Sequence, residues 1–410
     1  MEFDLDDPML LWREDVLTDP GPLYDRLRRD SPVWRLPGQK TYLVSDPGLI
    51  REAVARPNDL SSNLVSVLHL GENGGPVTFD MGAVGDRTHV LATADPPTHT
   101  RHRKLLQPHF SPAALAQLEP TLRDIVDAQL EPIVAAGGGD AVTGVSNPVP
   151  AQTMCRIAGI APQHAPFVME RVTATGPLMD GVTDLDGIVS AGAAALELLD
   201  FTQTQLDAAR STSSGDRPGL LGVLIDAIDA KLVDLDEARN LLVLLFNAGT
   251  ETTSSLIANT IETLACDPEL QDGLRRDPAG IPSALERVLR NDGPFQFHYR
   301  WSTTDVDLGG TRIPANSRVL LMWAAANRPS PEEAGGPAGE PSEPTAPAHL
   351  AFGRGLHFCI GAPLARLEAR IAIARLLAST STVRLDPDHA PVRPRSIFLR
   401  RHASLHLIVE

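Results

Sequence analysis

Residues 352–361 read Phe-Gly-Arg-Gly-Leu-His-Phe-Cys-Ile-Gly, and this stretch decides the interpretation of the chain. Its single cysteine, Cys359, lies in a glycine-rich loop, and a helical pattern over residues 362–377 begins just after it. The sulfur is therefore expected at a helix N-terminus, where free backbone N–H groups and the helix dipole favour thiolate over thiol. A lone thiolate held in this way suits a haem iron, and a buried inert cysteine is the alternative.

The same ten residues resemble the signature loop of the cytochrome P-450 superfamily, the haem-thiolate monooxygenases. The family loop reads Phe-Gly-x-Gly-x-His/Arg-x-Cys-x-Gly, and every fixed position is matched. The resemblance runs from about residue 20 to the C-terminus and looks closest to the soluble bacterial members. It implies haem b (iron protoporphyrin IX) as the cofactor, Cys359 as the metal ligand, and Phe352 and His357 as cofactor-binding residues.

The composition is that of an acidic globular protein. The chain has 410 residues, 42% of them hydrophobic, and a formal net charge of −16 at pH 7. This balance argues against nucleic acid as a partner, because phosphate contacts need a basic face. Residues 1–7 do not resemble a signal peptide, and no run approaches the roughly 20 apolar residues that span a membrane. With three widely spaced cysteines, we expect a cytoplasmic protein without disulfides or a membrane partner.

Helical patterns dominate the chain, and strand patterns are few and short. Strands are expected within residues 32–44, 306–319 and 392–409. Residues 60–97 and 328–347 have no regular pattern and are rich in glycine, proline or small polar residues. A loop as long as residues 60–97 inside a compact domain is usually functional, and residues 328–347 are expected to form an irregular exposed loop. The pattern predicts a mainly α fold with small β-sheets.

The resemblance implies the cytochrome P-450 (haem-thiolate) fold as a single large domain over residues 1–410. Within it we expect an N-terminal β-containing part at about 20–95 and a helical haem-binding part at about 96–410. The longest helical run, residues 234–265, begins with a capping box and is apolar nearly all round in its middle. It should therefore cross the core.

Residues 248–253, Ala-Gly-Thr-Glu-Thr-Thr, lie inside that long helix. Gly249 costs up to about 1 kcal/mol relative to alanine in a helix interior, so it needs a reason. The Thr252 hydroxyl can bond back to the Ala248 carbonyl and distort the helix, which would open a notch for dioxygen. Thr252 would stabilise the reduced dioxygen and Glu251 would relay protons. Threonines packed in an ordinary helix are the alternative. The family pattern Ala/Gly-Gly-x-Asp/Glu-Thr is matched in full.

Four basic side chains suit the propionates of a haem. His99 and Arg103 are four residues apart and so share one helical face. Arg300 on an extended segment and His357 in the cysteine loop offer further donors to a carboxylate. The resemblance implies propionate contacts at all four positions, and surface salt bridges are the alternative.

Basic residues near these motifs would steer an acidic electron donor toward the thiolate side. The resemblance implies a ferredoxin as that donor, itself reduced by a ferredoxin reductase. Ordinary solvated side chains are an equally good interpretation. The residues are Arg101, Lys104, Arg354, Arg366 and Arg370.

Substrate contacts are carried over by position alone. Most of these segments are apolar, which suits a small hydrophobic molecule, either free or tethered to a carrier protein. Core packing is the alternative for each. The segments are residues 61–90, 178–185, 245–248, 294–297 and 397–398.

One departure concerns the family's Glu-x-x-Arg motif. Arg290 aligns with its arginine, but Arg287 stands where the glutamate belongs. The loop after residue 327 also lacks the family elements that partner this glutamate. We therefore expect a replaced network, with Arg287 facing solvent or bound to an acid, because two buried guanidinium groups would cost several kcal/mol. Candidate acids are Glu286, Glu332 and Glu333.

These features predict a haem-thiolate monooxygenase. It would insert oxygen from dioxygen into a small organic molecule, or couple it oxidatively, as a tailoring step in natural-product (secondary metabolite) biosynthesis. Two alternatives stay open. One is a peroxide-driven haem oxidase, and the other is a catalytically degenerate haem-binding partner protein.

Overall fold

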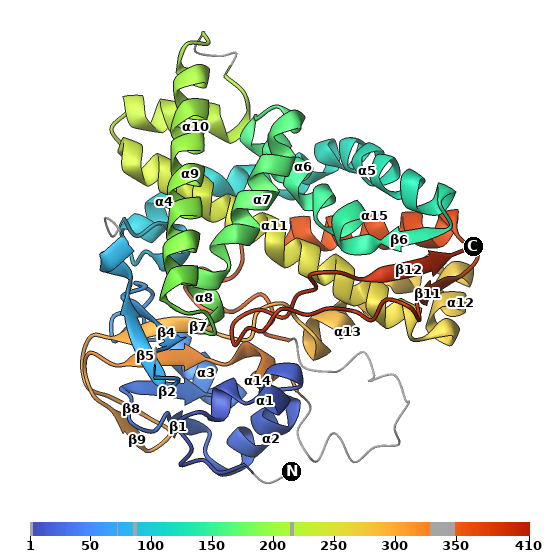
Figure 1. Ribbon diagram of the computed structural model, residues 1–410. Helices are drawn as coiled ribbons and strands as arrows, with labels where there is room; N and C mark the ends of the chain where they lie inside the picture. The colour runs from blue at the N-terminus through green and yellow to red at the C-terminus, as the bar shows by residue number, and fades with distance from the viewer. Residues whose placement is uncertain (1–2, 72, 85–87, 214–216, 329–348) are drawn as a thin grey trace.

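The computed structural model describes residues 3–71, 73–84, 88–213, 217–328 and 349–410, and helices predominate in them (Figure 1). The α-helices are α1 Glu14–Thr18, α2 Gly21–Asp30, α3 Pro47–Val54, α4 Thr98–Leu106, α5 Pro112–Ala135, α6 Pro148–Ala158, α7 Ala165–Thr175, α8 Pro177–Asp180, α9 Leu185–Arg210, α10 Gly219–Asp229, α11 Leu235–Ala265, α12 Pro268–Arg276, α13 Ile281–Asn291, α14 Trp323–Asn327 and α15 Ala362–Ser379. The strands are β1 Val33–Arg35, β2 Thr41–Val44, β3 Leu60–Ser61, β4 Ser66–Leu70, β5 Pro76–Asp80, β6 Gly138–Asp140, β7 His298–Ser302, β8 Val306–Leu308, β9 Thr311–Ile313, β10 Arg318–Leu321, β11 Val383–Leu385 and β12 His406–Val409. The predicted mainly α fold with small sheets is confirmed.

The largest sheet joins strands from both halves of the chain. Its order is β1-β2-β10-β7-β3, with β10 parallel to β2 and antiparallel to β7. A three-stranded sheet has the order β11-β12-β6, and β4-β5 and β8-β9 form hairpins. Gly309 and Gly310 form the β8-β9 turn with φ of 58° and 77°, a left-handed backbone that favours glycine. The division into parts at about residues 20–95 and 96–410 stays a prediction, and in space β7 and β10 belong to the β-rich part.

Helix α11 passes through the middle of the helical part (Figure 1). Its predicted capping box is present: Glu237 N–H donates to Asp234 Oδ1 at 2.7 Å, and Asp234 N–H donates to Glu237 Oε2 at 3.0 Å. Residues 253–261 are all buried, as expected for a helix that crosses the core. By length and composition alone α11 could cross a membrane, which the sequence analysis did not expect. Its apolar window is 67% buried inside the protein, as in a core helix.

Two segments differ from their predicted structure. Residues 60–97 contain β3 and the β4-β5 hairpin, whose short strands are separated by a glycine-rich turn that closes with Gly71 N–H donating to the Gly75 carbonyl. Of residues 392–409, only β12 is a strand. The backbone before it bonds to other parts of the fold: Ile397 N–H donates to the Asp180 carbonyl and Arg400 N–H to the Pro294 carbonyl. The predicted irregular loop at 328–347 lies, except for Arg328, outside the described residues.

Candidate active site

The cysteine loop has the backbone that its glycines predict. Cys359 N–H donates to the Phe352 carbonyl at 3.0 Å, which closes the loop. Gly353 and Gly355 have φ of 67° and 73°, so side chains there would strain the backbone. Helix α15 begins at Ala362, as predicted. The cysteine therefore lies at the start of a helix and not within one.

The surroundings of the Cys359 sulfur have opposing effects on its charge. Burial raises the pKa of the Cys359 thiol, while the backbone N–H groups of Gly361 and Ala362, and then Arg103 and Arg366, lower it by less. The N–H groups at the helix N-terminus lower the pKa of the thiol, as predicted. The prediction that the thiolate is favoured is wrong for the free thiol as a whole, because lost hydration outweighs these N–H groups. A thiolate here needs a further positive charge, and a metal cation at the sulfur would supply it.

The four predicted propionate-binding residues come together beside this loop. The rings of His99 and His357 lie 4.3 Å apart between centroids. Arg103 Nη1 donates to the Phe358 carbonyl at 2.8 Å, which ties α4 to the cysteine loop. Burial lowers the pKa of His357 to about 3, and the charges of Arg300, His99 and Arg103 add to this effect. Two arginines and two histidines are therefore crowded together, and burial with the neighbouring charges keeps His357 neutral at pH 7.

This crowded set of donors fits the carboxylates of a haem. The Nδ1 atoms of His99 and His357 are buried and have no hydrogen-bond partner in the described residues. Arg300 is 8% exposed, its Nη1 donates to the Tyr299 carbonyl at 2.8 Å, and burial lowers its pKa to about 10. Buried donors without acceptors are rare in native proteins. An anionic partner with several oxygens, such as a pair of propionates, would satisfy them.

Asp95, which has no predicted role, and Ser61 and Ser62, from the predicted substrate segment 61–90, support this cluster. Asp95 accepts hydrogen bonds from the Ser61 hydroxyl and, at 2.9 Å, from Ser62 N–H. The Ser62 hydroxyl lies 2.9 Å from His357 Nε2, and the Asp95 charge raises the pKa of Arg300. Asp95 thus balances a buried guanidinium and fixes the loop that orients His357. The sequence Asp-Pro-Pro at residues 95–97 marks Asp95 as a candidate, but the partners of Asp95 lie far away in sequence.

On α11 the predicted threonine bond is present and the predicted distortion is not. Thr252 Oγ1 donates to the Ala248 carbonyl at 2.7 Å. The helix is nevertheless α-helical throughout residues 248–253, without a widened turn. The reason for Gly249 is also different: a Cβ there would lie 2.5 Å from Met154 Sδ, so glycine allows α6 to pack closely. The Thr252 hydroxyl is therefore held by ordinary back-bonding.

Glu251 is a buried carboxyl with one cationic neighbour. Its Oε1 lies 3.1 Å from Arg401 Nε, and the side chain is 11% exposed. Burial raises the pKa of Glu251 to about 7, with Arg401 lowering it and Asp180 raising it. Arg401 also donates to both Asp180 oxygens at 2.7 and 2.6 Å. A carboxyl that titrates near neutrality can both hold and release a proton at working pH. Nothing local marks Arg401 or Asp180 as a partner of Glu251, so the sequence predicts no role for Arg401 and only substrate contact for the segment 178–185 that contains Asp180.

A different glutamate occupies the place of the family's Glu-x-x-Arg network. Glu286 on α13 accepts from Arg366 Nε and Nη2 at 2.6 and 2.9 Å, and it lies 2.8 Å from His349 Nε2. The Arg366 guanidinium lies 4.4 Å from the Phe352 ring centroid. Arg287 is exposed, as predicted. The network is thus built one residue earlier on α13, and it reaches the cysteine loop through Arg366. Glu332 and Glu333 lie outside the described residues.

The predicted basic patch is partly neutralised. Arg101 binds Glu237, Arg366 binds Glu286, and Arg370 binds Glu119 at 3.2 Å. Lys104 and Arg354 are exposed. The positive electrostatic field over this surface is therefore weaker than that of five unpaired cations. Ion pairs at the surface still carry hydrogen-bond donors that face solvent.

Three of the predicted substrate segments meet in an aromatic cluster. Phe398 contacts the rings of Phe295 and Phe297, with centroids 5.1 and 5.4 Å away. Ile397 N–H donates to the Asp180 carbonyl at 2.9 Å, which brings residues 178–185 to the same place. Leu245 of α11 is buried in the helical core. These contacts fit core packing as well as a cavity wall, so substrate contact stays a prediction.

The Glu286 network gives a testable contrast with Arg287. Glu286→Gln should lower stability by on the order of 1 kcal/mol, because Arg366 loses a bidentate carboxylate that is only half-buried and partly screened. Haem retention should fall with it, since Arg366 contacts Phe352. Arg287→Glu should change both by little, as an exposed substitution does. Thermal unfolding and the haem-to-protein ratio measure the two effects. A large gain in both from Arg287→Glu would mean that the network is broken rather than replaced.

Comparison with known proteins agrees with this geometry. The sequence profile of the family described as cytochrome P-450 matches residues 284–394. Cytochrome P-450 144 of Mycobacterium tuberculosis is 35% identical over 394 residues, which cover 96% of this chain and 89% of that protein. The cytochrome P-450 monooxygenase PikC of Streptomyces venezuelae is 33% identical over 382 residues, 91% and 86% of the two chains. The solved structure of CxnD, a cytochrome P-450 for C–S bond formation in chuangxinmycin biosynthesis, has a TM-score of 0.80 and 28% identity, with coverage of 95% and 94%.

A mainly helical fold with a cysteine at the start of a helix, beside a buried cluster of donors, defines a haem-thiolate protein. The chain belongs to the cytochrome P-450 family. It is accordingly a haem b monooxygenase, an oxidoreductase that receives its electrons from redox partners. It is atypical in having Arg287 at the glutamate position of the Glu-x-x-Arg motif.

Proposed function

We propose that this monooxygenase oxidises a small hydrophobic molecule in natural-product biosynthesis. The observation that carries the proposal is the group of buried donors, His99, Arg300 and His357, that lies beside the Cys359 loop. The Thr252 and Glu251 pair on α11 supports it as the part of the family pattern that serves oxygen activation. The relatives support the reaction class, since PikC is named a monooxygenase and CxnD serves a biosynthetic pathway. Insertion of oxygen is the reaction we propose, and oxidative coupling is the second candidate because CxnD forms a C–S bond.

Each site residue has a proposed role. Cys359 ligates the haem iron, and Phe352 lines the loop against the cofactor. His99, Arg103, Arg300 and His357 bind its propionates, which the buried unpaired Nδ1 atoms of the two histidines support. Ala248 leaves α11 without a bulky side chain at the proposed oxygen site, and Gly249 lets Met154 of α6 pack closely against the same turn. The haem supplies one-electron and dioxygen chemistry when bound.

Proton delivery falls to Thr252 and Glu251. Thr252 holds a proton at Oγ1, which at rest is shared with the Ala248 carbonyl at 2.7 Å. Glu251 supplies the next proton, since burial raises its pKa to about 7. A buried acid so poised can donate to a hydroxyl and be recharged from solvent. The Glu251 side chain is 11% exposed, so it is largely closed off from bulk water, which limits stray protonation.

For electrons we propose a ferredoxin and a ferredoxin reductase. Lys104 and Arg354 are the exposed cations that support docking of an acidic donor on the thiolate side. The substrate is a small molecule, either free or bound to a carrier protein, and a cytoplasmic location stays a prediction. Nucleic acid is not proposed as a partner, because the chain carries a net charge of −16.

Turnover experiments separate this function from the two alternatives. A compound panel is screened for a shift of the iron spin state, and the best compound is incubated with a surrogate ferredoxin system or with hydrogen peroxide alone. Product that depends on ferredoxin and dioxygen supports the proposal. Equal or faster turnover with peroxide alone would indicate a peroxide-driven oxidase. Haem binding without product in either assay would indicate a degenerate partner protein, which the intact Thr252 and Glu251 pair disfavours.

A further inference from the structure

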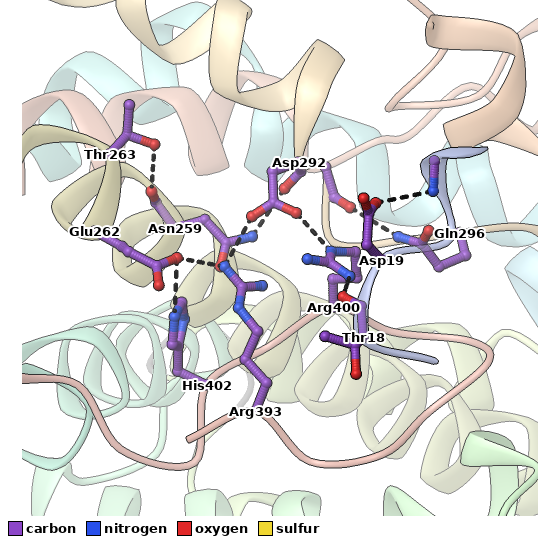
Figure 2. Close-up of polar contacts among 12 residues, drawn as sticks. Thr18, Asp19, Asn259, Glu262, Thr263, Asp292, Gln296, Arg393, Arg400 and His402 are labelled. Atoms are coloured by element: carbon purple, nitrogen blue, oxygen red, sulfur yellow. Dashed lines mark hydrogen bonds and ion pairs between the residues drawn. The ribbon is translucent and has the colours of Figure 1, made fainter. Parts of the chain in front are cut away.

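Residues 393–402 form a segment that two acids hold at its base; we call it the C-terminal strap. Arg393 Nη2 binds both Glu262 and Asp292, the latter at 2.9 Å. Asp292 also accepts from Arg400 Nε at 2.6 Å. Figure 2 shows Arg393 lying between the two carboxylates, with Arg400 on the far side of Asp292. Each acid therefore anchors the strap to a different helix end, Glu262 near the end of α11 and Asp292 just after α13.

The two ends of the strap, at Arg393 and His402, contact the same glutamate, Glu262. His402 Nε2 lies 3.2 Å from Glu262 Oε2, the atom that Arg393 also contacts (Figure 2). Asn259 Nδ2 donates to the Asp292 carbonyl at 2.8 Å, which fixes α11 to the end of α13. Arg393 and His402 lower the pKa of Glu262 to about 2, against burial, which raises it. The base of the strap is thus held by charged contacts to α11 itself.

The strap carries Arg401 into the space between α8 and α11. At its tip, Ile397 N–H donates to the Asp180 carbonyl, and Ile397 Cδ1 packs where a Cβ on Gly181 would be 2.6 Å away. Arg401 then reaches Asp180 on α8 through two bonds and Glu251 on α11 through one contact at 3.1 Å. One guanidinium therefore serves two acids on different helices.

The three charged groups are nearly closed off from water. The side chains of Arg401, Asp180 and Glu251 are 11%, 6% and 11% exposed. Gly176 closes the space from the α7 side, since a Cβ there would lie 3.1 Å from Arg401 Nη2 and 3.5 Å from Glu251 Oε1. Bidentate pairs are the stronger ones, so Asp180 holds most of the cation's hydrogen bonding. A single buried cation cannot fully compensate two carboxylates, and the more weakly bound Glu251 is the one that keeps a proton.

We propose that Arg401 is a positioning residue for proton delivery. The strap holds it in place, and its guanidinium contacts are shared between Asp180 and Glu251. The share of these contacts that Glu251 receives sets how readily it gives up its proton. Because the strap also carries Ile397 and Phe398, the residue that positions the proton donor and one predicted wall of the substrate site lie on the same segment. The proposal rests on the proposed function, in which Glu251 supplies protons to the reaction.

The two partners of Glu251 have effects of opposite sign. Arg401 lowers and Asp180 raises the pKa that burial has brought to about 7. Asp180 also interacts with His69 of β4, whose Nε2 lies 3.2 Å from the Leu178 carbonyl: burial lowers the pKa of His69, and the Asp180 charge raises it by less. Removing Arg401 should therefore raise the pKa of Glu251, and removing the Asp180 charge should lower it. A merely structural role would not produce opposite shifts.

The test titrates Glu251 in the holoprotein by infrared difference spectroscopy. The carboxylic acid band of Glu251 is assigned by its loss in Glu251→Gln, and its midpoint pH is compared among variants. We expect Arg401→Gln to move the midpoint up by about one pH unit and Asp180→Asn to move it down by a similar amount. Arg401→Lys keeps one charge but not the bidentate geometry, so its midpoint should lie between wild type and Arg401→Gln.

A control variant lies on the same strap. Arg395 is 54% exposed and pairs with the exposed Glu14, so Arg395→Gln should leave the midpoint unchanged. If Arg401→Gln does not fold, the sign of the Asp180→Asn shift decides alone. An unchanged or upward midpoint in Asp180→Asn, or shifts of one sign in both variants, would overturn the proposal. Failure of the proposed function is separate, because it would appear in the turnover assays of the wild-type protein, as product with peroxide alone or as no product, whatever the midpoint pH of Glu251.

Discussion

Cys359→Ser should abolish the strongly red-shifted Soret band that reduced haem-thiolate proteins give with carbon monoxide. A serine hydroxyl is far less acidic than a thiol and is a poor ligand for haem iron, so the axial bond should be lost although the loop keeps its shape. Product formation should fall to background. Haem could still be retained through the buried donors around Arg300 and His357, which do not depend on the sulfur. The measurement is the reduced carbon monoxide difference spectrum of the purified variant.

The other two cysteines are matched controls for this experiment. Cys155 is buried in the helical core, where burial raises its pKa to about 12, and Cys266 is exposed at the end of α11. Neither lies in a glycine-rich loop. Cys155→Ser and Cys266→Ser should therefore keep the thiolate band. A band that survives in Cys359→Ser and disappears in Cys155→Ser would refute the assignment of the ligand.

The parts of this site that could be predicted from the sequence are those whose chemistry is local. Gly353 and Gly355 predict the tight loop around Cys359, because a left-handed backbone favours glycine. The capping box at Asp234 and the back-bond from Thr252 to Ala248 join residues three or four apart, so helical spacing alone specifies them. For such features the structure agrees with the pattern.

The parts that escaped prediction depend on contacts between distant segments. Arg401 lies 150 residues after Glu251, and no periodicity connects them. Gly249 was read as the mark of a distorted helix, whereas its reason is Met154 on α6. The charge of the Cys359 sulfur was judged from its helix terminus, and burial, which only the fold determines, proved the larger effect. Glu286 is the residue before Arg287, which occupies the glutamate position of the Glu-x-x-Arg motif. The role of Glu286 could not be predicted, because it depends on contacts with Arg366 and His349, which are far away in sequence.

Thr252→Ala should keep haem and substrate binding and divert electrons to hydrogen peroxide. The variant loses the hydroxyl to which we assign proton transfer to the reduced dioxygen, so the reaction should stop at peroxide more often. Product formed per electron pair should fall on the order of 10²-fold, within the range of proton-transfer catalysis. Glu251→Gln should have a similar effect, since an amide cannot release a proton. It should also remove the dependence of coupling on pH near 7, where the pKa of Glu251 lies.

The control for Thr252 is another threonine on the same helix. Thr263 Oγ1 donates to the Asn259 carbonyl at 2.8 Å, the same kind of back-bond, eleven residues beyond Thr252 on α11. Thr263→Ala should therefore match Thr252→Ala in any change of helix stability and keep full coupling. The readouts are electron consumption, peroxide and product, each measured with the surrogate ferredoxin system. Supplying hydrogen peroxide instead should restore much of the product in Thr252→Ala, because that oxidant brings both protons with it. If coupling is unchanged in both Thr252→Ala and Glu251→Gln, proton delivery must follow another route, and the assignment of this pair is wrong.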